Sequence, residues 1–209
     1  SSGTVLCAVE YWDGSTGGHG ISAYIRDVAT GIWGRVAIFD PATSSDERGY
    51  WPCLVVAEDR IMCFAWVHNP NYGDDRMRVR CWTSTDSGLT WRMTSRQCTT
   101  DTTTYVSTAA GSASVFWAGR LRGAYNNGQV LLIAHCRRSI LGATALGDIA
   151  FQWASGDLGQ SLTLIYQGTG DTVTPSNFAG HDIIPYGGGF AISFCSGDSD
   201  IVNAELYVS

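Results

Sequence analysis

The sequence contains no lysine, and its positive charge comes from 13 arginines that are spread along the chain. Only 15% of the residues are charged, and the formal net charge is −6 with a pI near 5.0. A protein that binds nucleic acid through its phosphates needs a concentrated basic face, so we expect no nucleic-acid partner. We interpret the missing lysine mainly as coding bias, although arginine is also the side chain that binds carboxylates with two parallel hydrogen bonds.

Long apolar runs are absent too, and none approaches the roughly 20 residues that cross a bilayer as a helix. We therefore expect no membrane insertion. C-x-x-C pairs are missing, and the 7 cysteines do not cluster with the 4 histidines, which argues against zinc. There is no phosphate-binding loop, nucleophile elbow or HExxH string. The sequence predicts neither a metal nor a cofactor.

The odd number of cysteines leaves their redox state open. Cys53 and Cys63 lie in apolar strand patterns, where a thiol behaves as a small core hydrophobe. A hairpin would also allow these two residues to face each other. Free buried thiols fit the count at least as well as a secreted disulfide framework does.

What the chain has in abundance is glycine and aromatic residues: 25 Gly, 8 Trp, 9 Tyr and 7 Phe. This composition predicts an all-β protein with many tight turns. Strict alternation over 76–82 places three apolar residues on one face of a strand, opposite Arg76, Arg78 and Arg80. We expect that strand to be half-buried with one charged, solvated face.

An internal repeat organises the chain into approximate units 1–40, 50–98, 110–168 and 180–209. The clearest unit has strands over 50–56, 60–67 and 76–83, and then a turn into a fourth strand. In the next unit, 115–118 and 129–136 are the expected inner strands and 148–154 the third. The last unit has strands over 181–186, 190–194 and 202–208. Segments 4–11 and 21–26 match the second and third strands of a unit whose first strand is missing.

Residues 84–91 read S-x-D-x-G-x-T-W at the end of a strand. Ser84 and Asp86 can accept hydrogen bonds from turn amides, Gly88 supplies a positive φ, and Trp91 can enter the core beneath the turn. The motif fixes a turn and carries no chemistry. The alternative is an ordinary Asp-Ser-Gly hairpin that happens to precede a tryptophan.

This string resembles the Asp-box of the sialidase-type β-propellers. A second copy has Leu in place of Trp and comprises Ser155, Asp157, Gly159 and Leu162, and 27–33 is a degenerate third copy. The resemblance implies a β-propeller of four-stranded antiparallel blades, about four of which are seen here out of a six-bladed ring. We expect a piece of a longer propeller, or a last blade that strands from elsewhere complete.

The same family hydrolyses terminal sialic acid with an arginine triad, a tyrosine nucleophile backed by a glutamate, and an aspartate acid/base. Its first arginine would align with Tyr50 in the segment 49–52, so that carboxylate clamp is missing. The aspartate position falls near Arg76, with Asp74 and Asp75 displaced into the preceding loop. The resemblance therefore implies no catalytic residue within this chain.

Two groups of residues are candidates for ligand binding. Tyr72, Asp74 and Asp75 offer ring stacking and hydrogen bonds to a sugar, against the alternative of an exposed polar loop. Arg137 and Arg138 follow an inner strand, in a place where propeller loops reach a ligand-binding rim, against the alternative of a solvated loop pair.

Our first hypothesis is a non-catalytic propeller module that acts in binding or structure within an extracellular, cell-surface or virion assembly, with other protein chains as partners and a glycan as ligand. The alternative is an exo-sialidase-type glycoside hydrolase whose catalytic blades lie outside this chain. A third option is a host-recognition protein that binds glycans without cutting them.

Overall fold

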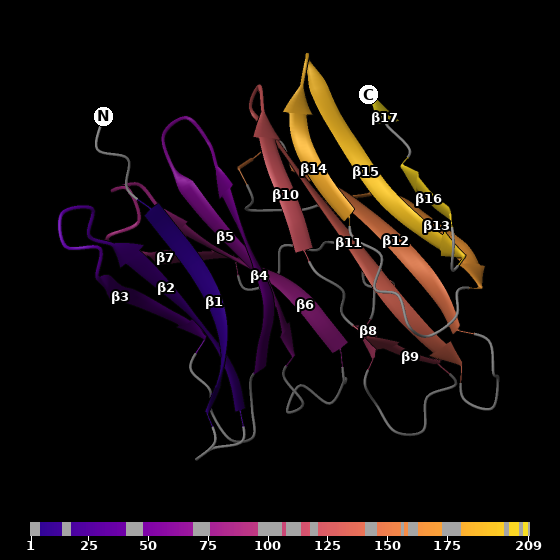
Figure 1. Ribbon diagram of the computed structural model, residues 1–209, viewed down its shortest axis with the longest axis horizontal. Coiled ribbons are helices and arrows are strands. Elements are labelled where there is room, and N and C mark those ends of the chain that lie inside the picture. Colours follow the sequence, from indigo (N-terminus) through magenta and orange to yellow (C-terminus); the bar gives the residue numbers. More distant parts are fainter. Residues whose placement is uncertain are drawn as a thin grey trace.

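The computed structural model describes residues 5–13, 18–40, 48–68, 76–95, 106–107, 114–117, 121–140, 146–155, 157–158, 163–172, 181–198, 201–204 and 207–208. In these ranges all regular structure is β-strand, arranged in four antiparallel sheets that follow one another in chain order (Figure 1). The predicted all-β class is confirmed. No helix in the described ranges is long and apolar enough to span a membrane.

The first two sheets come from the N-terminal half. Sheet 1 has three strands, β1 (Val5–Asp13), β2 (Gly18–Arg26) and β3 (Trp33–Asp40). Sheet 2 has five strands, β4 (Arg48–Val56), β5 (Ile61–His68), β6 (Arg76–Ser84), β7 (Arg92–Ser95) and β8 (Val106–Ser107), the last pairing with β6. The strands expected over 50–56, 60–67 and 76–83 are all present.

The other two sheets repeat the same strand order. Sheet 3 has five strands, β9 (Ser114–Trp117), β10 (Leu121–Asn126), β11 (Gln129–Ile140), β12 (Leu146–Ser155) and β13 (Thr163–Thr172). Sheet 4 has four strands, β14 (His181–Tyr186), β15 (Gly189–Asp198), β16 (Ile201–Ala204) and β17 (Tyr207–Val208). The single strand expected over 202–208 is therefore two short strands.

The first strand of sheet 3 differs from the prediction. Residues 114–117 form β9, which pairs with the C-terminal end of β11. The first strand in the order of the sheet is β10. The cause is a two-residue hairpin in which Asn127 and Gly128 both have positive φ, 49° and 82°, as a type I′ turn requires. Asn-Gly between apolar segments was the sequence signal for this hairpin.

Face-to-face packing of neighbouring sheets creates the core. Sheets 1 and 2 bury a cluster that includes Ile21, Ala23, Ala65 and Trp82. The opposite face of sheet 2 packs on sheet 3 through Met62, Phe64, Trp66, Leu121 and Leu132, among others. Sheets 3 and 4 share Leu131, Ile133, Ile183, Phe190 and Ile192. Sheet 2 is therefore covered on both faces.

This double burial corrects the prediction for β6. Arg80, expected on a solvated face, is only 7% exposed and lies opposite Ala65 of β5, in the layer between sheets 1 and 2. Alternation of arginine with apolar residues identified the strand correctly. It did not reveal that a third layer covers the polar face.

The disulfide alternative for Cys53 and Cys63 is also wrong. Cys53 pairs in register with Phe64, and Cys63 with Leu54, so the two thiols belong to the cores on opposite faces of sheet 2. Both are free. Burial raises the pKa of Cys53 to about 12 and that of Cys63 well above its usual value, as expected for inert core thiols.

Strands β4, β10 and β14 lie next to one another along the row of sheets (Figure 1). Gly123 of β10 lies against Cys53 and Val55 of β4, and Asn126 at the end of β10 donates a hydrogen bond to the Gly187 carbonyl beyond the end of β14. We call the edge at which β4 and β6 begin, and β1 and β11 end, the start rim. The opposite edge, with the turns 27–32, 84–91 and 127–128, is the turn rim.

The contact of Gly123 gives a stability test. A Cβ there would collide with Leu132 Cδ2 and lie 2.7 Å from Val55 Cγ2, both inside the core. We expect Gly123→Ala to lower the free energy of unfolding by about 1–3 kcal/mol through overpacking. Urea unfolding measures this. Gly34→Ala is the matched control, because a Cβ at Gly34 meets nothing within 4 Å; an equal loss in both variants would contradict the packing.

Candidate functional site

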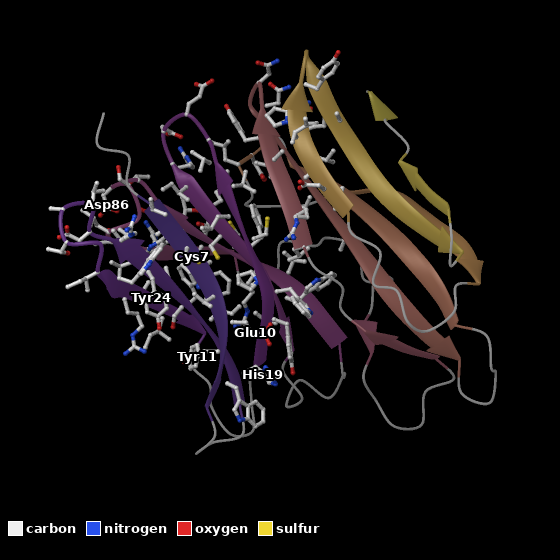
Figure 2. The ribbon with its side chains drawn as sticks, viewed as in Figure 1. Cys7, Glu10, Tyr11, His19, Tyr24 and Asp86 are labelled. Atoms are coloured by element: carbon white, nitrogen blue, oxygen red, sulfur yellow. The ribbon has the colours of Figure 1, made fainter. Side chains whose placement is uncertain are left out.

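The turn 84–91 lies at the turn rim and is held by side chains (Figure 2). Ser84 Oγ accepts a hydrogen bond from Gly88 N at 2.8 Å and donates one to Asp86 Oδ1 at 2.8 Å. Asp86 also accepts from the backbone N–H of Thr90 at 2.8 Å and from its hydroxyl at 2.5 Å. Trp91 Nε1 donates to the Gly88 carbonyl at 2.9 Å, and the ring packs edge-on against Phe39. These contacts close the turn and engage both oxygens of the Asp86 carboxylate.

The second predicted copy is described only in part, because Gly159 and Leu162 lie outside the described residues. Leu158 has φ 55°, close to the 61° of Ser87 at the equivalent place in the first copy. Leu158 packs, partly buried, against the core between sheets 2 and 3. The two turns thus share an unusual backbone conformation, although assignment of the second one as an Asp-box stays a prediction.

The predicted ligand residues are only partly visible. Tyr72, Asp74 and Asp75 lie outside the described residues, in the connection between β5 and β6. Arg137 and Arg138 belong to β11, where they pair with Trp117 and Phe116 of β9, and their side chains are not described. Because β11 runs toward the start rim, the topology brings Arg137 and Arg138 near that edge.

A cluster that sequence reasoning missed lies at the same rim, in the seam between sheet 1 and β4, where Figure 2 labels Glu10 and His19. We call Glu10, Trp12, His19, Tyr50 and Trp51 the Glu10 cluster. In the β1–β2 register Trp12 is directly opposite His19, and Glu10 is opposite Ile21. Glu10 therefore reaches His19 diagonally on one face of the sheet. The same face of sheet 1 carries the core residues Ile21 and Ala23 further along β2. The apolar seam between sheets 1 and 2 therefore ends in a polar, aromatic group.

Both oxygens of the Glu10 carboxylate are engaged. Oε1 lies 2.8 Å from Nδ1 of His19, and Oε2 accepts a hydrogen bond from the backbone N–H of Trp51 at 3.2 Å. The side chains of Glu10 and His19 are 25% and 29% exposed. The pair is thus shielded from bulk water and still reachable from the rim.

Aromatic rings flank this pair. The His19 ring contacts the Trp12 ring edge-on, with centroids 4.8 Å apart, and the Tyr50 ring, with centroids 4.9 Å apart. The Trp12 side chain is 60% exposed. An exposed indole beside hydrogen-bonding groups is a surface on which the apolar face of a sugar ring can lie.

The backbone at Trp51 is unusual. Its φ is 51°, in the left-handed region that a bulky residue rarely adopts, and the β4–β5 register shifts between Tyr50 and Cys53. Such strain persists only where surrounding contacts impose it, and it is frequent at functional sites. The hydrogen bond from Trp51 N to Glu10 is one such contact.

Arginines that are scattered in the sequence converge on the start rim by topology: Arg48 begins β4, Arg76 begins β6, and Arg137 and Arg138 lie near the end of β11. Antiparallel pairing, which linear spacing does not reveal, brings these four positions to one edge. Arg122 pairs with Ile133 in the middle of β11, and it acts with Asp182 on the Cys53 thiol electrostatically.

A cavity of about 440 Å³ lies elsewhere, at the turn rim, and it is lined by Arg60, Thr83, Thr85, Arg92, Met93 and Thr94. The Arg60 guanidinium is already paired with Asp59 through two hydrogen bonds of 2.8 and 2.7 Å. We therefore place the candidate site at the Glu10 cluster. Among the described residues, no group of His, Cys, Asp and Glu could hold a metal ion.

No family model matches the chain, and no curated protein matches it in sequence. Solved structures do. An α-L-arabinofuranosidase of glycoside hydrolase family 93 from Fusarium graminearum, in complex with arabinobiose, is 16% identical with a TM-score of 0.60, covering 93% of this chain and 54% of its own. The Fusarium graminearum arabinofuranosidase in complex with an iminosugar inhibitor is also 16% identical, with a TM-score of 0.61, covering 98% of this chain and 59% of its own.

A family 117 glycoside hydrolase of the marine bacterium Zobellia galactanivorans is 9% identical with a TM-score of 0.52, covering 90% of this chain and 55% of its own. The chain thus spans little more than half the length of these structures. At such identities the likeness concerns the fold alone: an all-β, propeller-like arrangement of antiparallel sheets.

The turn 84–91 predicts a pH dependence. The hydroxyl and N–H of Thr90, with the Ser84 hydroxyl, lower the pKa of Asp86 to about 2. Since the folded-state pKa lies below the unfolded value near 4, Asp86 stabilises the fold above about pH 4, and this contribution is lost as the pH falls toward 2. We expect urea midpoints over this window to fall more steeply in the wild type than in Asp86→Asn. Glu58 lies in a neighbouring exposed hairpin, and Glu58→Gln should keep the wild-type slope. A wild-type slope in Asp86→Asn would contradict the assignment of this pH dependence to Asp86.

Proposed function

We propose that this chain is part of a carbohydrate-active propeller and that it binds glycans at the start rim. The observation that carries the proposal is the Glu10 cluster, in which the exposed Trp12 ring lies beside the hydrogen-bonded pair Glu10–His19. Sugars combine an apolar ring face with many hydroxyls, so an aromatic surface next to acceptors and donors suits them. The likeness to structures of glycoside hydrolases, one of them with arabinobiose, supports the proposal.

Binding without cleavage is the form that the described residues favour. Most glycoside hydrolases need two carboxyl groups on either side of the scissile bond, about 5–9.5 Å apart. Glu10 is the carboxylate of the cluster, and both of its oxygens are occupied by hydrogen bonds. A non-catalytic module within an extracellular, cell-surface or virion assembly, with other protein chains as partners, fits this arrangement.

A second candidate, an exo-sialidase-type glycoside hydrolase with its catalytic blades outside this chain, is favoured by a different observation. Arg48 and Arg76 begin strands at the start rim, and Arg137 and Arg138 lie near the end of β11 at the same rim. Guanidinium groups bind carboxylates with two parallel hydrogen bonds, so a rim of this kind would suit an acidic sugar.

Calorimetric titration with arabinobiose, galactobiose and sialyllactose tests the proposal. We expect at least one of these sugars to bind, and Trp12→Ala to weaken that binding about tenfold or more, which corresponds to about 1.4 kcal/mol. Trp33→Ala is the matched control, because Trp33 is 45% exposed but begins β3 at the turn rim.

The same titration separates the candidates. Preference for sialyllactose over the two neutral sugars favours the hydrolase. An equal loss of affinity in Trp33→Ala and Trp12→Ala would overturn the placement of the glycan site at the start rim. The same holds if none of the three sugars binds.

A further inference from the structure

The Glu10 carboxylate joins two features that would otherwise be independent: the imidazole of His19 and the left-handed backbone of Trp51. One oxygen faces Nδ1 of His19 at 2.8 Å, and the other accepts the backbone N–H of Trp51 at 3.2 Å. The three residues come from three strands, β1, β2 and β4, in two different sheets. The carboxylate therefore fixes the site across the seam between the sheets.

The direction of the first hydrogen bond follows from the chemistry of the carboxylate. An ionised carboxylate is an acceptor only, toward His19 as toward the backbone N–H of Trp51. With Glu10 ionised, Nδ1 of His19 must carry a hydrogen. In the neutral imidazole this leaves Nε2 as an acceptor, and among the described residues Nε2 of His19 has no hydrogen-bond partner.

We propose that Glu10 is a positioning residue: it holds His19 in the tautomer that offers Nε2 to a hydroxyl of a sugar lying on Trp12, and it secures the left-handed conformation of Trp51. The ligand class is an uncharged sugar ring with a free hydroxyl at its edge. This inference rests on the proposed function, and it assigns the acceptor to His19 because both oxygens of Glu10 are already engaged.

Geometry supports this division of roles. The Trp12 and His19 rings are 4.8 Å apart and edge-on, so a ring that stacks on Trp12 brings its substituents beside the imidazole. The Tyr50 ring, with its centroid 4.9 Å from that of His19, packs against the imidazole. The hydrogen bond from Trp51 N to Glu10 holds the backbone of Trp51 at φ 51°.

The tautomer can be measured in the free protein, independently of any glycan. Long-range proton–nitrogen NMR correlations at about pH 8, above the ordinary histidine pKa of about 6.5, report which ring nitrogen carries the hydrogen. His19→Gln assigns the signal among the 4 histidines. We expect the Nδ1–H form in the wild type and in Glu58→Gln, and a shift toward Nε2–H in Glu10→Ala.

The ligand role is measured by affinity for whichever of the three sugars binds the wild type. Glu10→Ala should weaken binding about five- to tenfold, as loss of one oriented hydrogen bond does. Glu10→Gln keeps one acceptor oxygen but offers an NH₂ group to the second donor, so it should fall between wild type and Glu10→Ala. Urea midpoints of both variants exclude global unfolding, and Glu10→Gln serves where Glu10→Ala fails to fold.

An Nε2–H tautomer in the wild type, or an unchanged tautomer in Glu10→Ala, would overturn the positioning role. Unchanged sugar affinity in Glu10→Ala with a shifted tautomer would overturn the contact with the sugar hydroxyl. If no sugar binds the wild type, the proposed function fails, and the tautomer result still decides what Glu10 does to His19.

Discussion

Burial of sheet 2 on both faces is the constraint on which the rest of the structure depends. Residues Met62–Val67 of β5 are all buried, alternately against sheet 1 and against sheet 3. Phe64 and Trp66 fill one core, and Cys63 and Ala65 belong to the other. A strand with large residues on one side and small ones on the other can pack between two sheets without a void. The stacking of sheets follows, and with it the alignment of β4, β10 and β14.

That alignment explains why the two rims differ. At the turn rim, short hairpins such as 127–128 and the side-chain-closed turn 84–91 end the sheets with local hydrogen bonds. At the start rim, the apolar seam between sheets 1 and 2 ends, and Glu10, His19 and Tyr50 replace the aliphatic residues of the core. Residues from distant strands therefore meet at the start rim.

Local patterns were enough for much of the fold. Alternation and turn residues predicted β4, β5, β6 and β14 closely, and the S-x-D-x-G string predicted the hydrogen bonds that Ser84 and Asp86 make. The missed strand, β10, carries Gly123 and Arg122 in place of a clear apolar alternation. Arg80 was misjudged because burial of its face depends on a neighbouring sheet, which no local window contains.

The candidate site was harder to predict for a related reason. Glu10 and His19 are nine positions apart and Trp51 follows 41 positions after Glu10, so no sequence motif joins them. The register of β1 with β2 and the packing of β4 bring them together. Two features did carry a signal: Trp12 and His19 flank a glycine-rich hairpin, and the segment 49–52 had already been singled out by its resemblance to a propeller strand start.

The central claim is that the start rim binds a glycan through the Glu10 cluster. A crystal structure of the protein with the tightest-binding of the three sugars, arabinobiose, galactobiose and sialyllactose, tests it most directly. We predict density for a sugar ring on Trp12, with a hydroxyl within hydrogen-bond distance of His19 Nε2. A sugar bound instead in the cavity lined by Arg60 and Arg92 at the turn rim would contradict it.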